Sequence, residues 1–335
     1  MYPEIIGERK LILEPSDREF ESHSVCNPTV IQDNGVSHIF YRAIRAPNYS
    51  TVGHGIIQED GEILRDEKPT ITPSLPEEKE GCEDARIVKI DDTFYMLYTA
   101  WDGSAARVMA AESQDMKQWY KVGIISPNMP IENVVKEEKN PLYRYKGVQQ
   151  MATWGSHVPI WDKDAVLLPE KINGKFVMLH RFNPSIQIVY FDSFDELRTD
   201  EFWHQYFKTL SENTIASPEQ GWEAKKIGAG STPIKTPEGW LVFYHGLDLH
   251  GVYRAGAMLL DLNDPSKVKG RLREPLFEGK NDWEVNGIVN HVVFPQGVEE
   301  FDDTYKVYYG CADKRIGVIE IDKKKLLEKL MQENA

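Results

Sequence analysis

The segment 81–90 reads GCEDARIVKI, in which two carboxylates and an arginine run directly into alternating apolar residues. After the turn DDT, the segment 94–98 reads FYMLY, and the two apolar runs predict the strands of a β-hairpin. Glu83, Asp84 and Arg86 then lie where the first strand begins. Charged side chains beside a core are costly unless they are paired or face a polar cavity, so this is a candidate functional site. A local Asp/Arg pair that only ties down a loop is the alternative.

The same hairpin pattern recurs five times along the chain. In each copy a first strand leads through a turn to an aromatic-rich second strand, and a further apolar segment follows. The second strands are marked by Phe40, Phe94, Phe176, Trp240 and Tyr305. The third segments are 53–57, 107–111, 186–190, 255–260 and 316–319. This repeat predicts an all-β fold, a five-bladed β-propeller built as a single domain over residues 1–335. A β-sandwich or barrel is the alternative.

Two segments fall outside the repeat. Residues 127–161 are rich in Lys, Glu, Asn and Pro and then in Tyr, Met and Trp, which predicts an insertion acting as a lid or an oligomer contact. Residues 323–333 place Leu326, Leu327 and Leu330 on one helical face and predict a short C-terminal helix. Elsewhere we expect almost no helix.

The composition of the 335 residues narrows the function classes. A formal net charge of −14 works against a nucleic-acid partner, because phosphate backbones repel it. The sequence has neither an apolar run of membrane-spanning length nor a secretory signal at its start, so we expect no membrane partner and a cytoplasmic location. Three widely spaced cysteines and no metal-ligand spacing indicate that no metal is bound.

Basic residues occupy matching places in the repeat. Equivalent positions of propeller blades converge on one channel, and four of them would set cations beside the carboxylates of segment 81–90. These residues are Lys163, Arg181, Lys226 and His245. Such a pocket favours an oxyanion, most simply phosphate. A buried core position is the favoured interpretation for His180, whereas for His245 the core and the pocket are both open.

Ten short strings between about residues 26 and 313 resemble glycoside hydrolase family 130. They are CNP at 26–28, GCEDARI at 81–87, LPEKINGK at 168–175, LHR at 179–181, KIGAG at 226–230, GWL at 239–241, YHG at 244–246, LDLNDP at 260–265, VVFP at 292–295 and YGCAD at 309–313. The resemblance implies a five-bladed propeller and an enzyme that acts on β-mannosides, by phosphorolysis or, in some members, by hydrolysis.

The resemblance also implies a role for each matching residue. It makes Asp84 the general acid, which works through a substrate hydroxyl while inorganic phosphate attacks the anomeric carbon from the opposite face and α-D-mannose 1-phosphate is released. The implied phosphate ligands are Lys163, Arg181, Lys226 and His245. The implied sugar contacts are Asn27, Arg42, Arg86 and Asp313, and we group Glu83 with them. Phosphate is then a co-substrate, and no cofactor is expected.

Two other functions stay open. An inverting β-1,2-mannosidase needs a second carboxylate to activate water, and Glu170, Glu212 and Glu223 are candidates that the sequence does not rank. A non-catalytic glycan-binding propeller needs no such carboxylate. The expected partners are a β-manno-oligosaccharide or mannosyl disaccharide and phosphate, and the insertion and terminal helix are compatible with a homo-oligomer. Linkage and acceptor sugar are left open.

Overall fold

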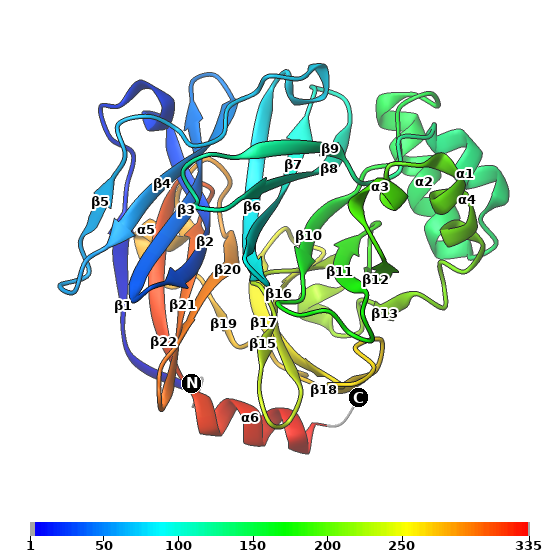
Figure 1. Ribbon diagram of the computed structural model, residues 1–335. Coiled ribbons are helices and arrows are strands. Elements are labelled where there is room, and N and C mark those ends of the chain that lie inside the picture. The colour runs from blue at the N-terminus through cyan, green and yellow to red at the C-terminus, as the bar shows by residue number, and fades with distance from the viewer. Residues whose placement is uncertain (1–3, 334–335) are drawn as a thin grey trace.

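The computed structural model describes residues 4–333 and consists mainly of antiparallel strands that follow one another as five meanders (Figure 1). The first meander contains β2 (Ser24–Asp33), β3 (Val36–Arg45), β4 (Tyr49–Ile57) and β5 (Ile63–Arg65). The second contains β6 (Gly81–Ile90), β7 (Thr93–Trp101), β8 (Ala106–Ser113) and β9 (Tyr120–Ile124). The third contains β10 (Lys163–Leu167), β11 (Phe176–Arg181), β12 (Ile186–Phe191) and β13 (Thr214–Ala216).

The last two meanders complete the order of strands. The fourth contains β14 (Lys226–Ala229), β15 (Ile234–Lys235), β16 (Trp240–Leu247), β17 (Tyr253–Leu260), β18 (Val268–Arg271) and β19 (Phe277–Glu278). The fifth contains β20 (Val293–Glu300), β21 (Thr304–Cys311) and β22 (Arg315–Asp322). The N-terminal strand β1 (Ile5–Leu13) pairs antiparallel with β22 and so becomes the fourth strand of the last meander.

The predicted hairpins are confirmed. Segment 81–90 is β6, and each of the five aromatic markers lies in the second strand of its meander. A single parallel bridge between Ser50 and Gly81 joins the first two meanders, so the described strands form four sheets, none of which closes into a barrel. A mostly β chain with a short C-terminal helix is therefore confirmed, and the five-bladed propeller stays a prediction.

Helices are more numerous than predicted, which corrects the expectation of almost none outside the tail. They are α1 (Ile131–Glu137), α2 (Pro141–Trp154), α3 (Phe194–Leu197), α4 (Asp200–Lys208), α5 (Asp282–Val285) and α6 (Lys323–Gln332). Short 3-10 turns are η1 (Glu19–Glu21), η2 (Pro76–Glu78) and η3 (Gly221–Glu223). The C-terminal helix α6 is confirmed, with all three predicted leucines buried. Within residues 4–333 no helix is long and apolar enough to span a bilayer.

The insertion 127–161 is largely helical, and α1, α2 and α4 gather on one side of the sheets (Figure 1). Helix α2 begins after Asn140, whose side chain accepts a hydrogen bond from the backbone N–H of Leu142 at 2.9 Å. It buries only Tyr143 and Gly147. So small a buried face leaves no apolar periodicity to reveal the helix in the sequence.

A buried carboxylate recurs in four of the five meanders, and we call these groups the buried Glu–Tyr pairs. In each, a fully buried glutamate from a short turn accepts a hydrogen bond from a tyrosine of the second strand. The pairs are Glu21 with Tyr41, Glu78 with Tyr98, Glu223 with Tyr244 and Glu284 with Tyr309. A cation completes each pair, respectively Arg65, Lys121, Arg271 and Arg9. The recurrence indicates that the meanders are copies of one structural unit.

Candidate active site

Left-handed residues interrupt the first strands of the first three meanders. Asn27, Asp84 and Asp164 have φ angles of 49°, 54° and 57°, and the pairing register shifts at each of them, as in a β-bulge. Asn and Asp tolerate this conformation better than most residues, because their short polar side chains bond locally. The bulges set three buried polar side chains at equivalent places in the fold.

Asp84 is held by a neutral amide from the first meander. Asn27 Nδ2 donates a hydrogen bond to Asp84 Oδ1 at 2.8 Å, and Arg42 Nη1 is 3.8 Å from the same oxygen. No described residue donates to the second oxygen, Oδ2, and the side chain is 9% exposed. Asp84 therefore keeps one carboxylate oxygen for a group outside the protein.

Glu83 connects a predicted sugar contact, Arg42, with a predicted phosphate ligand, Lys163. Its Oε1 lies 2.6 Å from Arg42 Nη2, and its Oε2 lies 3.2 Å from Lys163 Nζ. Burial alone would raise the pKa of Glu83, but the charges of Arg42 and Lys163 outweigh burial and lower it. Glu83 is thus an ionised residue that fixes Arg42 and Lys163 in place.

Asp164 lies at the centre of the other cations, and the sequence analysis missed it. Arg181 Nε is 3.0 Å and His245 Nε2 is 3.6 Å from Asp164 Oδ2, while Arg86 Nη2 is 3.5 Å from Oδ1. Burial alone would raise the pKa of Asp164, but nearby positive charges outweigh burial and hold it well below its usual range. These charges belong to Arg181, His245, Arg86 and Lys226.

Arg86 is a link between meanders. Its Nε donates to the carbonyl oxygen of Gly230 at 2.9 Å, and its Nη2 donates to that of Ala229 at 3.0 Å. Its Nη1 donates to the backbone oxygen of Asp84 at 3.3 Å. Because its donors are engaged by protein groups, the geometry makes Arg86 a positioning residue between Asp84 and the fourth meander, and its predicted sugar contact stays a prediction.

Buried nitrogens without a protein partner remain on this side of the site, and burial lowers the pKa of His245 well below its usual value, so that its ring is neutral near pH 7. Among the described residues, Nη1 of Arg181 and both ring nitrogens of His245 are buried and have no hydrogen-bond partner. Burial and the charge of Arg181 lower the pKa of Lys226, whose Nζ lies 5.4 Å from the centroid of the Tyr253 ring. The His245 ring stacks on Phe294, with centroids 4.0 Å apart. Arg181 Nη1 and the single N–H of a neutral His245 ring are donors that an anion can accept from.

Asp313 adds a further carboxylate, just beyond β21. Burial raises the pKa of Asp313 to about 6. The charge of Arg42 lowers this pKa, whereas the charges of Asp84 and Glu83 add to the increase. In the part of the chain that the structure describes, Asp313 forms no ion pair. Ser24 Oγ donates to its backbone oxygen at 2.6 Å, which ties this turn to β2.

The structure brings the ten predicted site residues into one connected group. They are Asn27, Arg42, Glu83, Asp84, Arg86, Lys163, Arg181, Lys226, His245 and Asp313. His180 lies outside it, buried between Asp162 and Tyr206, as the core interpretation predicted. Within residues 4–333, no group of three or more His, Cys, Asp or Glu side chains is arranged to hold a metal ion.

Asp164 and Tyr253 are the members that sequence reasoning missed. Asp164 follows Lys163 at the start of a first strand as Asp84 follows Glu83, so alignment of the repeat copies could have found it. Tyr253 begins β17, a third strand, and carries no such signal. Burial, against the charge of Arg181, raises the pKa of Tyr253 to about 12.

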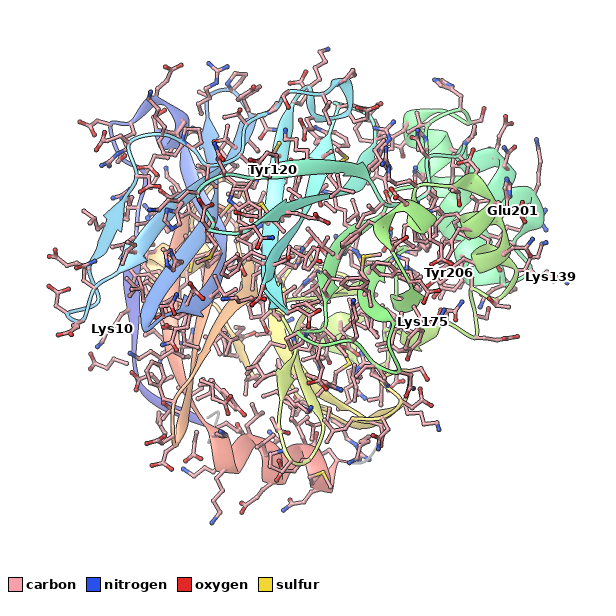
Figure 2. All side chains as sticks on the ribbon, viewed as in Figure 1. Lys10, Tyr120, Lys139, Lys175, Glu201 and Tyr206 are labelled. Carbon is pink, nitrogen blue, oxygen red and sulfur yellow. The ribbon has the colours of Figure 1, made fainter. Side chains whose placement is uncertain are left out.

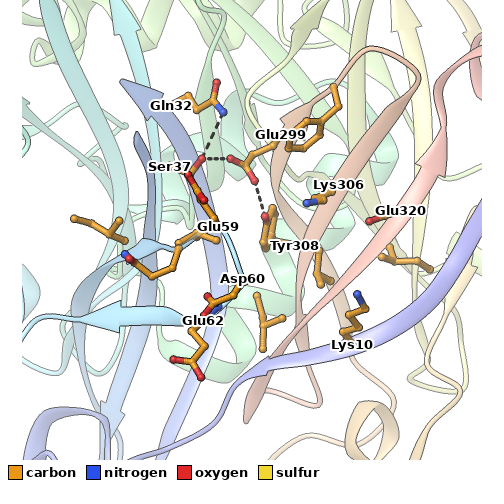
Figure 3. Close-up of a pocket in the computed structure, with 18 of the residues that line it drawn as sticks. Lys10, Gln32, Ser37, Glu59, Asp60, Glu62, Glu299, Lys306, Tyr308 and Glu320 are labelled. Carbon is orange, nitrogen blue, oxygen red and sulfur yellow. Dashed lines mark hydrogen bonds between the residues drawn. The ribbon is translucent and has the colours of Figure 1, made fainter. Parts of the chain in front are cut away.

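A cavity of about 830 Å³ lies apart from this site, between the first and fifth meanders and β1 (Figure 3). Its rim is rich in carboxylates, namely Glu8, Glu59, Asp60, Glu62, Glu299 and Glu320. Glu299 accepts hydrogen bonds from Ser37 and Tyr308 across the cavity wall (Figure 3). These six carboxylates outnumber the lysines Lys10 and Lys306 of the same wall, so the cavity disfavours an anion.

Comparisons with known proteins show the family of the chain. The family model of glycoside hydrolase family 130, described as beta-1,4-mannooligosaccharide phosphorylase, matches residues 6–333. A beta-1,2-mannobiose phosphorylase of Thermoanaerobacter sp. (strain X514) is 38% identical, with 95% of this chain and 96% of the relative covered. A 1,2-beta-oligomannan phosphorylase of the same strain is 35% identical, with 95% and 97% covered.

A solved structure shares the fold. The beta-1,2-mannobiose phosphorylase from Listeria innocua, in complex with beta-1,2-mannobiose, superposes with a TM-score of 0.73 at 23% identity, covering 96% of each chain. The family match and these relatives together define an enzyme of the glycoside phosphorylase type. The chain belongs to glycoside hydrolase family 130.

Proposed function

We propose that the chain is an inverting β-mannoside phosphorylase, which uses inorganic phosphate to cleave a β-mannosidic bond and releases α-D-mannose 1-phosphate. The observation that carries the proposal is the group of unpartnered donors of Arg181 and His245, which Arg86 and Asp164 connect to Asp84. Two relatives are named for β-1,2-linked mannose, which supports this linkage for the substrate.

In the proposed reaction, the bond between the anomeric carbon and the leaving oxygen breaks, and a phosphate oxygen bonds to that carbon from the opposite face. Asp84 gives its proton to a substrate hydroxyl, which passes its own proton to the leaving oxygen. Lys163, Arg181, Lys226 and His245 hold the phosphate, and the guanidinium of Arg181 offsets part of its negative charge. Phosphate is already an anion, so no general base is needed.

Hydrolysis is the second candidate function. The structure places its three predicted general bases away from the site. Glu170 pairs with Lys235 at 2.7 Å on the surface, and Glu212 is exposed. Glu223 is fully buried in a Glu–Tyr pair with Tyr244. None of the three contacts the site residues. The attacking group in hydrolysis is a neutral water molecule, so hydrolysis would give the cluster of anion-binding donors no role.

We further propose that the five meanders are the blades of a single-domain propeller, with the site at the end where the first strands begin. Phosphate would be the co-substrate, without a cofactor. A cytoplasmic location and a homo-oligomer are parts of the same proposal that solution experiments must address.

One assay separates the two reactions. Purified protein is incubated with β-1,2-mannobiose, β-1,4-mannobiose and β-mannosyl-N-acetylglucosamine, with and without inorganic phosphate, and the products are identified. We expect α-D-mannose 1-phosphate to form from the β-1,2-linked substrate only when phosphate is present. Release of free mannose at the same rate without phosphate would show a hydrolase instead.

A further inference from the structure

Helix α2 turns an apolar stripe toward solvent. Leu142, Tyr145 and Val148 follow one another at intervals of three residues and are 42%, 57% and 47% exposed. Residues at this spacing lie on one face of an α-helix, and Tyr143 and Gly147, which α2 buries, lie on the opposite face. Neighbouring exposed apolar side chains on a soluble protein mark an interaction surface.

The same segment is a basic part of an acidic chain. Residues 139–161 contain no Asp or Glu, although the chain has 53 of them and a formal net charge of −14. The segment does contain Lys139, Arg144 and Lys146, and within residues 4–333 no carboxylate forms an ion pair with any of the three. Helix α2 therefore presents its apolar stripe together with unpaired positive charge, which favours an acidic partner.

Helix α2 is also held firmly on the body of the protein. Gln150 Nε2 donates to the carbonyl oxygen of Pro159 at 2.8 Å. Trp154, Trp161 and Trp101 form a tryptophan cluster in which the ring of Trp154 lies 5.2 Å from Trp161 and 5.7 Å from Trp101, between centroids. A helix that is already ordered loses little conformational entropy when a partner binds it.

The cavity between the first and fifth meanders has the opposite charge. Its six rim carboxylates outnumber the two lysines of the wall, and none of the six forms an ion pair with a described residue (Figure 3). Between the carboxylates the wall is apolar, and Val36 and Phe301 are 38% and 39% exposed. The other apolar side chains of the wall include Leu11, Ile12, Ile56, Ile57 and Val318. A concave apolar wall with a negative rim complements a basic helix with an apolar stripe.

The helix and the cavity lie at opposite ends of the molecule. Figure 2 shows Lys139, just before α2, and Lys10, in the cavity wall, on opposite sides of the protein. The two surfaces of one chain cannot meet, so their contact joins two copies head to tail. Such a heterologous contact forms closed rings or open chains. A symmetric dimer in which two α2 helices face each other would instead oppose like charges.

We propose that helix α2 of one copy docks into the acidic cavity of a second copy, so that the protein assembles head to tail. The inference rests on the homo-oligomer proposed above, adds the two surfaces that form it, and does not depend on the reaction at the site. It assigns the insertion 127–161 to assembly rather than to a lid.

The test uses two charge-reversed proteins and sedimentation velocity. The helix variant combines Lys139→Glu with Arg144→Glu, and the groove variant combines Glu59→Lys with Glu62→Lys, all at exposed positions. We expect the average mass of the wild type to rise with protein concentration and to fall at about 1 M salt, where the Debye length is about 3 Å. Each variant alone should be a single chain, because its helix and its cavity then carry charge of the same sign.

A mixture of the two variants identifies the pairing. The unchanged helix of the groove variant can still dock into the unchanged cavity of the helix variant, so we expect a complex of one copy of each that grows no further. Loss of assembly in the helix variant alone, with normal assembly in the groove variant, overturns the inference in favour of a symmetric contact between helices. Unchanged assembly of both variants overturns it too and leaves an oligomer built on another interface. A wild type that is a single chain at every concentration overturns both the inference and the homo-oligomer.

A further comparison tests the apolar stripe. Tyr145→Ala should weaken the association about tenfold in Kd, the equivalent of about 1.4 kcal/mol. Tyr120→Ala is the matched control and should leave Kd unchanged, because Tyr120 is a 66% exposed aromatic on β9, away from the helices (Figure 2). Equal effects of the two substitutions overturn the role of the stripe.

The control for net charge is Lys68→Glu combined with Lys117→Glu, at exposed positions outside both surfaces. It changes the net charge as much as the helix variant does and should assemble like the wild type. Loss of assembly in this control would show that overall repulsion, and not the proposed contact, separates the copies. Thermal unfolding checks that every variant is folded, so the outcome stands whether or not the protein proves to be a phosphorylase.

Discussion

Asp84 and Asp164 occupy equivalent bulges in consecutive meanders, yet their surroundings give them opposite chemistry. Asp84 accepts from the amide of Asn27 and has one oxygen without a described donor. Asp164 lies within 3.6 Å of Arg181 and His245, and positive charges hold its pKa well below the usual range. A carboxylate kept ionised in this way cannot serve as an acid, so Asp164 is not the proton donor, and the proposed reaction assigns that role to Asp84.

Replacing Asp84 with Asn should therefore remove the proposed proton donor while keeping a side chain of the same shape. We expect phosphorolysis of β-1,2-mannobiose to slow by about 10²- to 10⁴-fold, the usual contribution of general acid catalysis. The measurement is kcat at saturating phosphate, with thermal unfolding as a check on folding. Asp92→Asn, an exposed carboxylate in the turn of the same hairpin, is the control and should be fully active. Near-normal activity of Asp84→Asn would exclude it as the acid.

Replacing Asp164 with Asn should destabilise the protein, because Arg86 and Arg181 would then be buried without their counter-charge. We expect the free energy of unfolding to fall by about 3–5 kcal/mol in urea titration. The proposed function predicts that added phosphate restores part of the loss, since it would bind only the folded state and supply negative charge.

The control for Asp164 is Asp192→Asn, which removes a surface ion pair of 3.2 Å with Lys175. It should cost no more than about 1 kcal/mol. Equal stability of Asp164→Asn and the wild type would contradict the role of Asp164 as the counter-charge of Arg86 and Arg181.

Asp313 should give the protein a recognisable pH dependence. Its pKa rises from 3.8 to about 6 on folding, so between these values the folded state keeps a proton that the unfolded state has lost. Stability therefore falls as pH rises from about 4 to 6, by up to about 3 kcal/mol, and the penalty is constant above that range.

The variant Asp313→Asn lacks this titration. Its free energy of unfolding, relative to the wild type, should increase as pH rises from 4 to 7 in denaturant titrations. Asp302→Asn, an exposed carboxylate before β21, should show no such trend. A difference between Asp313→Asn and the wild type that is independent of pH would mean that the residue titrates normally.

At the scale of the element, the buried Glu–Tyr pairs fasten each short turn to the second strand of its meander. In the fourth meander, Glu223 Oε1 lies 2.6 Å from Arg271 Nη2, and Tyr244 Oη donates to Glu223 Oε2 at 2.9 Å. Glu223 also accepts from the backbone N–H groups of Glu219 and Gln220. A buried charge is tolerated here because every oxygen is hydrogen-bonded.

Breaking this pair should affect stability and spare the chemistry. We expect Glu223→Ala to cost about 3–5 kcal/mol, because Arg271 is left unpaired, and Tyr244→Phe to cost about 1–3 kcal/mol. Guanidinium titration measures both, and kcat per folded molecule should stay normal. The control is Glu219→Ala, an exposed side chain 3.8 Å from Arg271, which should cost less than about 1 kcal/mol. Equal losses of stability in Glu219→Ala and Glu223→Ala would show that the buried pair of Glu223 with Arg271 and Tyr244 does not stabilise the fold.

The strands could be predicted from the sequence, whereas the helices of the insertion could not. Alternation of apolar residues and the Asn173-Gly174 turn located the strands, and both turn residues have positive φ angles, as expected. Helix α2 was missed, since its buried face consists of Tyr143 and Gly147 alone. Gly147 is needed because a Cβ there would come within 2.4 Å of Val135 Cγ2, a contact that only the packed structure reveals.

At the scale of the whole molecule, the first strand completes the last meander. Strand β1 pairs with β22, and Arg9 Nη1 lies 2.8 Å from Glu284 Oε1. These contacts join the N-terminal strand to the last meander, between residues some 300 positions apart in the sequence. Without β1, the edge of β22 would expose unpaired backbone groups.

Removal of residues 1–13 should therefore open the fifth meander and leave Glu284 unpaired. We expect a protein that aggregates or unfolds at markedly lower temperature, measured by light scattering and calorimetry. A synthetic peptide of residues 4–14 should restore part of the stability by adding back the strand. A truncated protein as stable as the full chain would show that β1 is dispensable.

The sequence by itself determined the hairpins, the repeat of aromatic second strands and the ten candidate site residues, because alternation, turn chemistry and the family strings are local properties. Only the tertiary structure decided that Asp164 meets Arg181 and His245, that Arg86 links meanders, and that the insertion folds as helices against a tryptophan cluster. Those contacts join residues far apart in the chain, and burial and charge at such contacts depend on packing that no local pattern encodes.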